Sequence, residues 1–140
     1  MNWLTMHPSI FCCKVHTTGV YDPRKKVFRP LQGFATRGVS DILGIVKVEN
    51  WQNLLKPMTL GISFAIEVKT PESVKDFIRY IDPEYITAGK SASTMKLVVH
   101  AREQKEYLDQ VARFGGVSGV ATSVLEAQEI MKEVLSYGKK

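Results

Sequence analysis

The sequence predicts a single α/β domain in which a mixed central β-sheet is flanked by helices. Two observations lead to this prediction. The chain has 140 residues, of which 44% are hydrophobic and 24% charged, and these values are typical of one globular domain with a sizeable core. Segments with strand-like alternation also lie on both sides of segments with helical periodicity. A strand–helix–strand order of this kind typically gives a crossover connection within a mixed sheet.

Three strands are expected in the first half of the chain. They cover residues 9–16 ("SIFCCKVH"), 39–48 ("VSDILGIVKV") and 61–70 ("GISFAIEVKT"). The turn-rich segment 17–30 predicts a short hairpin between the first two of these strands. A connection over 49–61 joins the second strand to the third, so we expect these two strands to be antiparallel neighbours.

The second half of the chain predicts three helices and one further strand. A helix is expected to begin at Pro71, because proline suits the first helical position and Thr70 before it is a good cap. Ser123 and Glu126 have the spacing of a capping box at the start of the last helix. The expected elements are a helix over 71–81, a polar turn-forming segment over 82–96, a helix over 100–114, a strand over 117–123 and a helix over 123–138.

Basic residues are concentrated in segment 1–37. The whole chain has 19 Lys and Arg against 14 Asp and Glu, a net charge of +5. The first 40 residues hold six basic side chains and one acid, Asp22, which leaves 13 of each sign for the rest. This asymmetry predicts a surface for a polyanion, although a solvated turn would have the same composition. The six basic residues are Lys14, Arg24, Lys25, Lys26, Arg29 and Arg37.

Several sequence features concern the cellular compartment. No apolar run approaches the roughly 18 residues of a membrane-spanning helix, and the start of the chain does not resemble a signal peptide. Cys12 and Cys13 are adjacent, without a CxxC pair or a zinc-type spacing. These features predict reduced thiols in a cytoplasmic protein of the bacterial or phage type, with no membrane partner.

Three polar residues stand out in the expected second and third strands. Glu67 and Lys69 are two residues apart, so both side chains leave the same face of their strand. Asp41 near the start of the preceding strand can approach Glu67 if the two strands pair. A solvated strand face is one interpretation. The other is a site in which two carboxylates share a divalent cation, because such carboxylates otherwise repel each other.

The segments "GVSDILGI", "FAIEVKT" and "REQKEYLDQVARFGGVSGVATSV" together resemble the VRR-NUC branch of the PD-(D/E)XK nucleases. In that pattern an Asp opens one strand, E-x-K lies on the next, a Gln follows on a helix, and a glycine-rich turn closes the core. The resemblance runs from Gly38 to Ile130. It implies a restriction-endonuclease-like core in a single VRR-NUC domain over 1–140, with an inserted segment near 71–98.

The resemblance also implies roles for individual residues. Asp41 and Glu67 would bind Mg²⁺ or Mn²⁺, with the carbonyl of Val68 as a further ligand. Lys69 would position or activate the attacking water, and Gln104 would support the site from its helix. From the helical pattern alone, Gln104 would instead be expected to face solvent.

The function that the resemblance implies is metal-dependent endonucleolytic hydrolysis of phosphodiester bonds in DNA. Small stand-alone members of the family are similar to junction resolvases, so branched or flapped DNA, such as a Holliday junction, is the expected substrate, and DNA repair the expected process. The basic residues of segment 1–37 would then contact DNA phosphates. One small domain offers little surface for recognising a branch, so a homodimer is expected.

The chain departs from the family pattern at two positions. Family members carry a helical Glu upstream of the first strand, whereas the first Glu of this chain is Glu49. Ser40 occupies a place that is often taken by Pro, which is a mild departure. The absence of the upstream Glu favours one alternative, a catalytically inactive DNA-binding module on the nuclease fold. A third interpretation is an unrelated α/β domain with an accidental spacing of residues.

Overall fold

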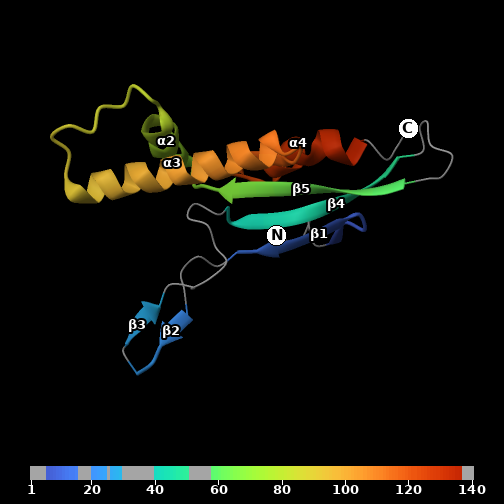
Figure 1. Cartoon of the computed structure of the whole chain (residues 1–140), viewed down its shortest axis with the longest axis horizontal. Coiled ribbons are helices and arrows are strands. Elements are labelled where there is room, and N and C mark those ends of the chain that lie inside the picture. The colour runs from blue at the N-terminus through green and yellow to red at the C-terminus, as the bar shows by residue number, and fades with distance from the viewer. Residues whose placement is uncertain (1–5, 16–19, 25, 30–39, 51–57, 137–140) are drawn as a thin grey trace.

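The computed structural model describes residues 6–15, 20–24, 26–29, 40–50 and 58–136. Four strands form one mixed sheet in the order β1–β4–β5–β6 (Figure 1). They are β1 (Ile10–Lys14), β4 (Ile42–Asn50), β5 (Met58–Val68) and β6 (Val117–Ala121). β4 is antiparallel to both β1 and β5, whereas β5 and β6 are parallel. The predicted α/β class, the mixed sheet and the pairing of the second and third strands are confirmed.

Helices cover both faces of the β5–β6 side of the sheet. α2 (Pro71–Ile81) and α3 (Ala92–Arg113) connect β5 to β6, and α4 (Val124–Ser136) follows β6. On one face, Phe64 of β5 belongs to the same core cluster as Met131 of α4. On the other face, Glu67 of β5 contacts Gln104 of α3. Because alternate residues of a strand point to opposite faces, α3 and α4 lie on opposite sides of the sheet.

Gly44 allows β1, β4 and β5 to lie close together at the centre of the sheet. A Cβ atom at this position would lie 2.5 Å from the carbonyl oxygen of Phe11 and 2.5 Å from the ring of Phe64. Real Cβ atoms do not approach other atoms so closely, and one of these two is a backbone atom that cannot rotate away. Glycine is therefore required here by packing.

Several elements extend beyond their predicted bounds. α3 begins at Ala92 and not at residue 100, because the Ser91 side chain caps it by accepting a hydrogen bond from the Thr94 N–H. The first residues of α3 were therefore wrongly predicted as turn-forming. β4 ends later and β5 begins earlier than predicted, because Asn50 of β4 still pairs with Met58 of β5 in the antiparallel ladder. Within the described part of the chain, no helix is long and apolar enough to cross a membrane.

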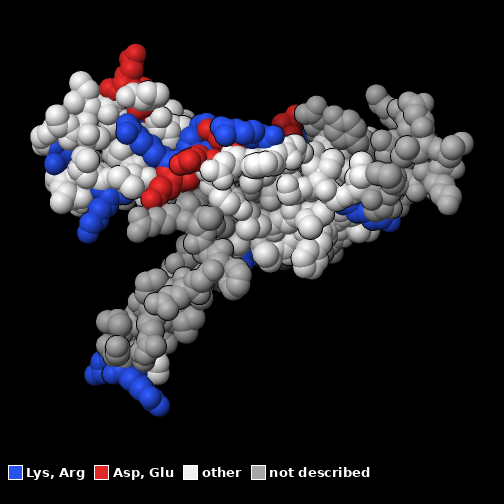
Figure 2. All heavy atoms as spheres, in the orientation of Figure 1, with Lys and Arg blue, Asp and Glu red and all other residues white. Residues whose placement is uncertain are grey.

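A small hairpin stands apart from the main sheet (Figure 1). It consists of β2 (Val20–Asp22) and β3 (Val27–Arg29), which pair antiparallel, as segment 17–30 predicted. Exposed Arg24 and Lys26 lie in its turn, and Figure 2 shows basic side chains gathered at its tip. We call residues 20–24 and 26–29 the basic arm.

Candidate active site

The candidate catalytic residues come from three elements that meet at one end of the sheet. Asp41 directly precedes β4, and Glu67 and Lys69 lie at and just beyond the end of β5. Because Ile42 pairs with Ile66 in an antiparallel ladder, the next positions outward are Asp41 and Glu67, which puts them opposite each other. Gln104 approaches from α3. The structure thus brings together the four residues to which the resemblance assigns roles.

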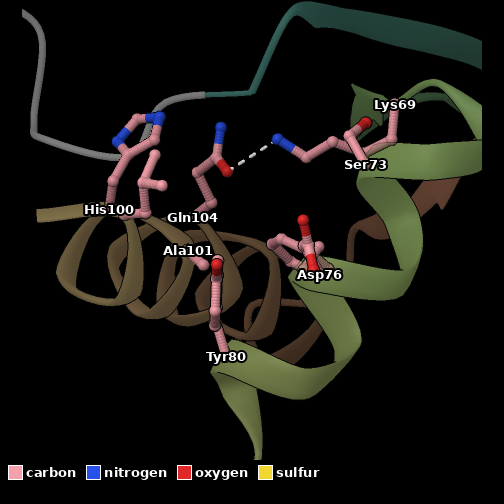
Figure 3. A pocket seen from close by; sticks show the side chains of 9 residues that line it. Lys69, Ser73, Asp76, Tyr80, His100, Ala101 and Gln104 are labelled. Atoms are coloured by element: carbon pink, nitrogen blue, oxygen red, sulfur yellow. Dashed lines mark hydrogen bonds between the residues drawn. The ribbon is translucent and has the colours of Figure 1, made fainter. Parts of the chain in front are cut away.

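Glu67, Lys69 and Gln104 form a closed set of hydrogen bonds. The Lys69 ammonium donates to Glu67 Oε1 at 2.6 Å and to Gln104 Oε1 at 2.9 Å. Figure 3 shows the second of these bonds across the cleft. The Gln104 amide donates in turn to Glu67 Oε1. Each side chain therefore holds the other two, which fixes the position of the carboxylate.

Glu67 is a buried carboxylate with one oxygen left over. Its exposed fraction is 2%, and its Oε2 atom has no hydrogen-bond partner within the described structure. Burial raises the pKa of Glu67 above its ordinary value, while the hydrogen bond and charge of Lys69 oppose this rise. The nearby charge of Asp41 raises the pKa of Glu67 further. A buried, unsatisfied carboxylate oxygen is costly unless a further ligand reaches it.

Asp41 is held in place by the backbone of β5. Its Oδ2 atom accepts a hydrogen bond from the Val68 N–H at 3.0 Å. Its own carbonyl accepts from the Val15 N–H at 2.7 Å, just beyond β1. Asp41 is thus fixed from both neighbouring strands. The suggested use of the Val68 carbonyl as a ligand stays a prediction, since the contact seen here involves the N–H.

The donor set at this end of the sheet fits a hard divalent cation. Asp41 and Glu67 supply carboxylate oxygens of the type that Mg²⁺ and Mn²⁺ prefer, and the unpartnered Oε2 of Glu67 is available for bonding. No group of three or more His, Cys, Asp or Glu that could hold a metal occurs among the described residues. An ion here would have two carboxylate ligands and would complete its shell with water and substrate oxygens, as Mg²⁺ commonly does.

Burial of Gln104 reverses what the helical pattern alone suggested. This side chain is only 6% exposed, because the face of α3 that carries it packs over the end of β5. Sequence reasoning missed His100, which lies one turn earlier on α3 and lines the same cleft as Gln104 and Lys69. The i, i+4 spacing of His100 and Gln104 is the signal that would have found it.

The described basic residues of segment 1–37 lie on β1 and on the basic arm. Lys14 is exposed and pairs in register with Ile42, so it lies at the same end of the sheet. Arg24 and Lys26 are exposed on the basic arm. Arg29 lies in β3, while Lys25 and Arg37 fall outside the described residues. Residues 1–5, which belong to the region upstream of the first strand where the family pattern has a helical Glu, also fall outside them.

Comparisons with protein-family models, with curated proteins and with solved structures each found no match. The fold and the site define an α/β domain with a four-stranded mixed sheet, and a cluster of carboxylate, ammonium and amide groups at one end of that sheet.

Proposed function

We propose that this protein is a metal-dependent endonuclease that hydrolyses phosphodiester bonds in DNA, on a restriction-endonuclease-like core of the VRR-NUC type. The observation behind the proposal is the convergence of Asp41, Glu67, Lys69 and Gln104. These residues follow one another in the chain in the order that the resemblance implies. They also come from the expected places: a strand start, the end of the next strand, and a helix.

Asp41, Glu67 and the carbonyl of Val68 would hold Mg²⁺ or Mn²⁺. When bound, such an ion polarises a phosphoryl oxygen and lowers the pKa of a coordinated water. The unpartnered Oε2 of Glu67 supports this assignment, because a buried carboxylate oxygen is destabilising unless a cation or a hydrogen-bond donor reaches it. The hydrogen bond from the Val68 N–H keeps Asp41 beside this position.

Lys69 is suited to orient the attacking water or a phosphoryl oxygen. An ammonium has three N–H donors, and the contacts to Glu67 and Gln104 use two of them. The side chain is 17% exposed, so its third donor can reach a bound substrate. Gln104 acts as a positioning residue, since it contacts both Glu67 and Lys69 and holds them at a fixed separation.

The choice of substrate and of a dimeric assembly in this proposal is based on the exposed basic residues and on the resemblance. Exposed Lys14, Arg24 and Lys26 are suited to sequence-independent phosphate contacts. Branched or flapped DNA is the proposed substrate, and two copies of the chain the proposed active form, since one small domain has little surface with which to recognise a branch.

The second candidate is a DNA-binding module on the same fold that lacks catalysis. Two observations favour it. The described residues supply two carboxylates and no third acidic ligand. The Glu67 carboxylate is also already paired with the Lys69 ammonium. The two candidates differ in one measurable property, which is cleavage.

Cleavage of labelled flap, splayed, duplex and four-way DNA with Mg²⁺ or Mn²⁺ tests the proposal. Glu67→Ala and Lys69→Ala should each abolish cleavage and leave binding largely unchanged, because the phosphate contacts come mainly from elsewhere. Glu129→Ala and Lys132→Ala are matched controls, since that exposed ion pair on α4 has the same charges. Retained cleavage in either site variant would refute the assignment. Wild-type binding without cleavage would favour the inactive module.

A further inference from the structure

A cleft of about 170 Å³ lies between α2 and α3, directly beside the candidate active site (Figure 3). Lys69 and Gln104 belong to both. The other residues that line the cleft are Ser73, Asp76, Phe77 and Tyr80 from α2, and Leu97, His100 and Ala101 from α3. A group bound in this cleft would therefore touch the same ammonium and amide that contact Glu67.

The nuclease resemblance does not account for this cleft. One wall is formed by α2, which lies within the inserted segment near 71–98. Thr70 and Ser73 form a reciprocal cap that stabilises the first turn of α2. The core between α2 and α3 includes Phe77 and Ala101, each 5% exposed. The cleft is thus a feature that this chain adds beside the site.

The chemistry of the lining favours a flat group with an apolar face and a polar edge. Phe77, Leu97 and Ala101 supply apolar surface, and His100 and the second amide N–H of Gln104 supply hydrogen-bonding groups. Figure 3 shows Tyr80 extending from α2 toward α3. A nucleobase combines these properties, whereas a phosphate does not.

Asp76 adds one hydrogen-bond acceptor to the edge of the cleft. Its carboxylate lines the α2 wall, is 56% exposed and pairs with Arg79 through Oδ1 at 2.6 Å. Its Oδ2 atom remains able to accept a hydrogen bond from a base amino group. Lys69 lies at the end nearest Glu67, where the phosphate to be cleaved would be bound. The base of one nucleotide would then occupy the cleft and its phosphate the active site.

The volume of the cleft limits the size of the base, and entry into a pocket requires that the base be unpaired. A cavity of about 150 Å³ is large enough to bind benzene, so about 170 Å³ accommodates one single-ring base. A base within a duplex is paired and stacked, and enters a pocket only when it is turned out or already unpaired. We propose that the cleft between α2 and α3 binds an unpaired, pyrimidine-sized base next to the bond that is cleaved. This inference rests on the proposed nuclease function and selects flapped or splayed DNA over intact duplex.

An abasic scan tests the inference. Each thymidine of an oligothymidine flap is replaced in turn by an abasic nucleotide, and binding to the full chain is measured by fluorescence anisotropy in EDTA, with cleavage measured in Mn²⁺. One position beside the cut should bind at least about fivefold more weakly, which is the lower end of the contribution of one base contact in single-strand binding proteins.

Leu97→Ala and Ala101→Leu, with Val99→Ala as the control, assign that effect to the cleft. Leu97→Ala should reduce the penalty at the sensitive position, whereas Val99→Ala should not. Both residues are about half exposed on α3, at 55% and 49%, and only Leu97 lines the cleft. Ala101→Leu fills the cleft and should remove the penalty, with a thermal melt to verify folding. If this variant does not fold, the comparison of Leu97→Ala with Val99→Ala tests whether the base binds in the cleft.

The outcomes separate this inference from the function on which it rests. Normal cleavage with a flat abasic scan would overturn the base-binding cleft and leave the nuclease assignment intact. A sensitive position that responds equally to Leu97→Ala and Val99→Ala would also overturn it. Absence of both DNA binding and cleavage in the wild type would overturn the two together.

Discussion

Replacing Gln104 by methionine should destabilise the protein in a way that depends on Glu67. Methionine keeps nearly the length and volume of glutamine, so the packing of α3 on β5 is conserved. It removes the donor to Glu67 Oε1 and the acceptor for the Lys69 ammonium. The substitution therefore isolates the two hydrogen bonds of Gln104 from its packing.

The two losses are unequal because the partners differ in exposure. Lys69 is 17% exposed, so water can replace the lost acceptor, while Glu67 at 2% has no such access. A hydrogen bond to a charged group contributes about 1.5–3 kcal/mol, so we expect a loss of about 2 kcal/mol in the free energy of unfolding. An unfolding entropy of about 2.1 cal/mol/K per residue converts this to a decrease in Tm of about 7 °C.

The loss should be larger at neutral pH than at acidic pH. The folded-state pKa of Glu67 is raised above 4.5, chiefly by burial, so protonation of Glu67 stabilises the fold. That stabilisation is fully present below about pH 4.5 and is lost as the pH rises through the folded-state pKa. Removing a donor to the carboxylate raises this pKa further. The variant should therefore lose stability more steeply than the wild type as the pH increases from 4.5.

Thermal melts followed by circular dichroism between pH 4.5 and 8 measure both effects. Gln110→Met is the matched control, because Gln110 is an exposed residue of the same helix, where a substitution should change the free energy of unfolding by less than about 0.5 kcal/mol. Equal Tm values for the two variants at pH 7.5, or a Gln104→Met deficit that is constant with pH, would refute the hydrogen-bonded role of Gln104.

Three further predictions concern the metal, the basic arm and the sheet. Mn²⁺ at ten times its Kd should raise the Tm by about 5 °C in a thermal-shift titration, and Asp41→Asn should remove this response, so equal responses in the two proteins would exclude this site. Replacing Arg24 and Lys26 by Gln should weaken binding to all DNA forms and reduce the salt slope by up to about 1.8, whereas an unchanged slope would mean a solvated turn. Gly44→Ala should lower the Tm by about 7 °C or more, because its Cβ would clash with the Phe11 carbonyl, and an unchanged melt would contradict that packing.

The sequence by itself determined the features that depend on neighbouring residues. The cap at Thr70 and the start of α2 at Pro71 could be predicted from the sequence, because the groups that form a helix cap lie within one turn of each other. The two-residue spacing of Glu67 and Lys69 placed them on one strand face, and their hydrogen bond is consistent with that placement. The α/β class and the mixed sheet also followed, since periodicity and element order are local properties of the chain.

Only the tertiary structure decided which faces of the helices and strands pack against each other. The helical pattern placed Gln104 in solvent, and its burial arises because α3 packs over the end of β5. The bond from the Val68 N–H to Asp41 joins the end of β5 to the residue before β4, and the cleft is lined by both α2 and α3 beside Lys69. Such contacts join residues tens of positions apart, and their geometry follows from how whole elements pack, which local side-chain periodicity does not specify.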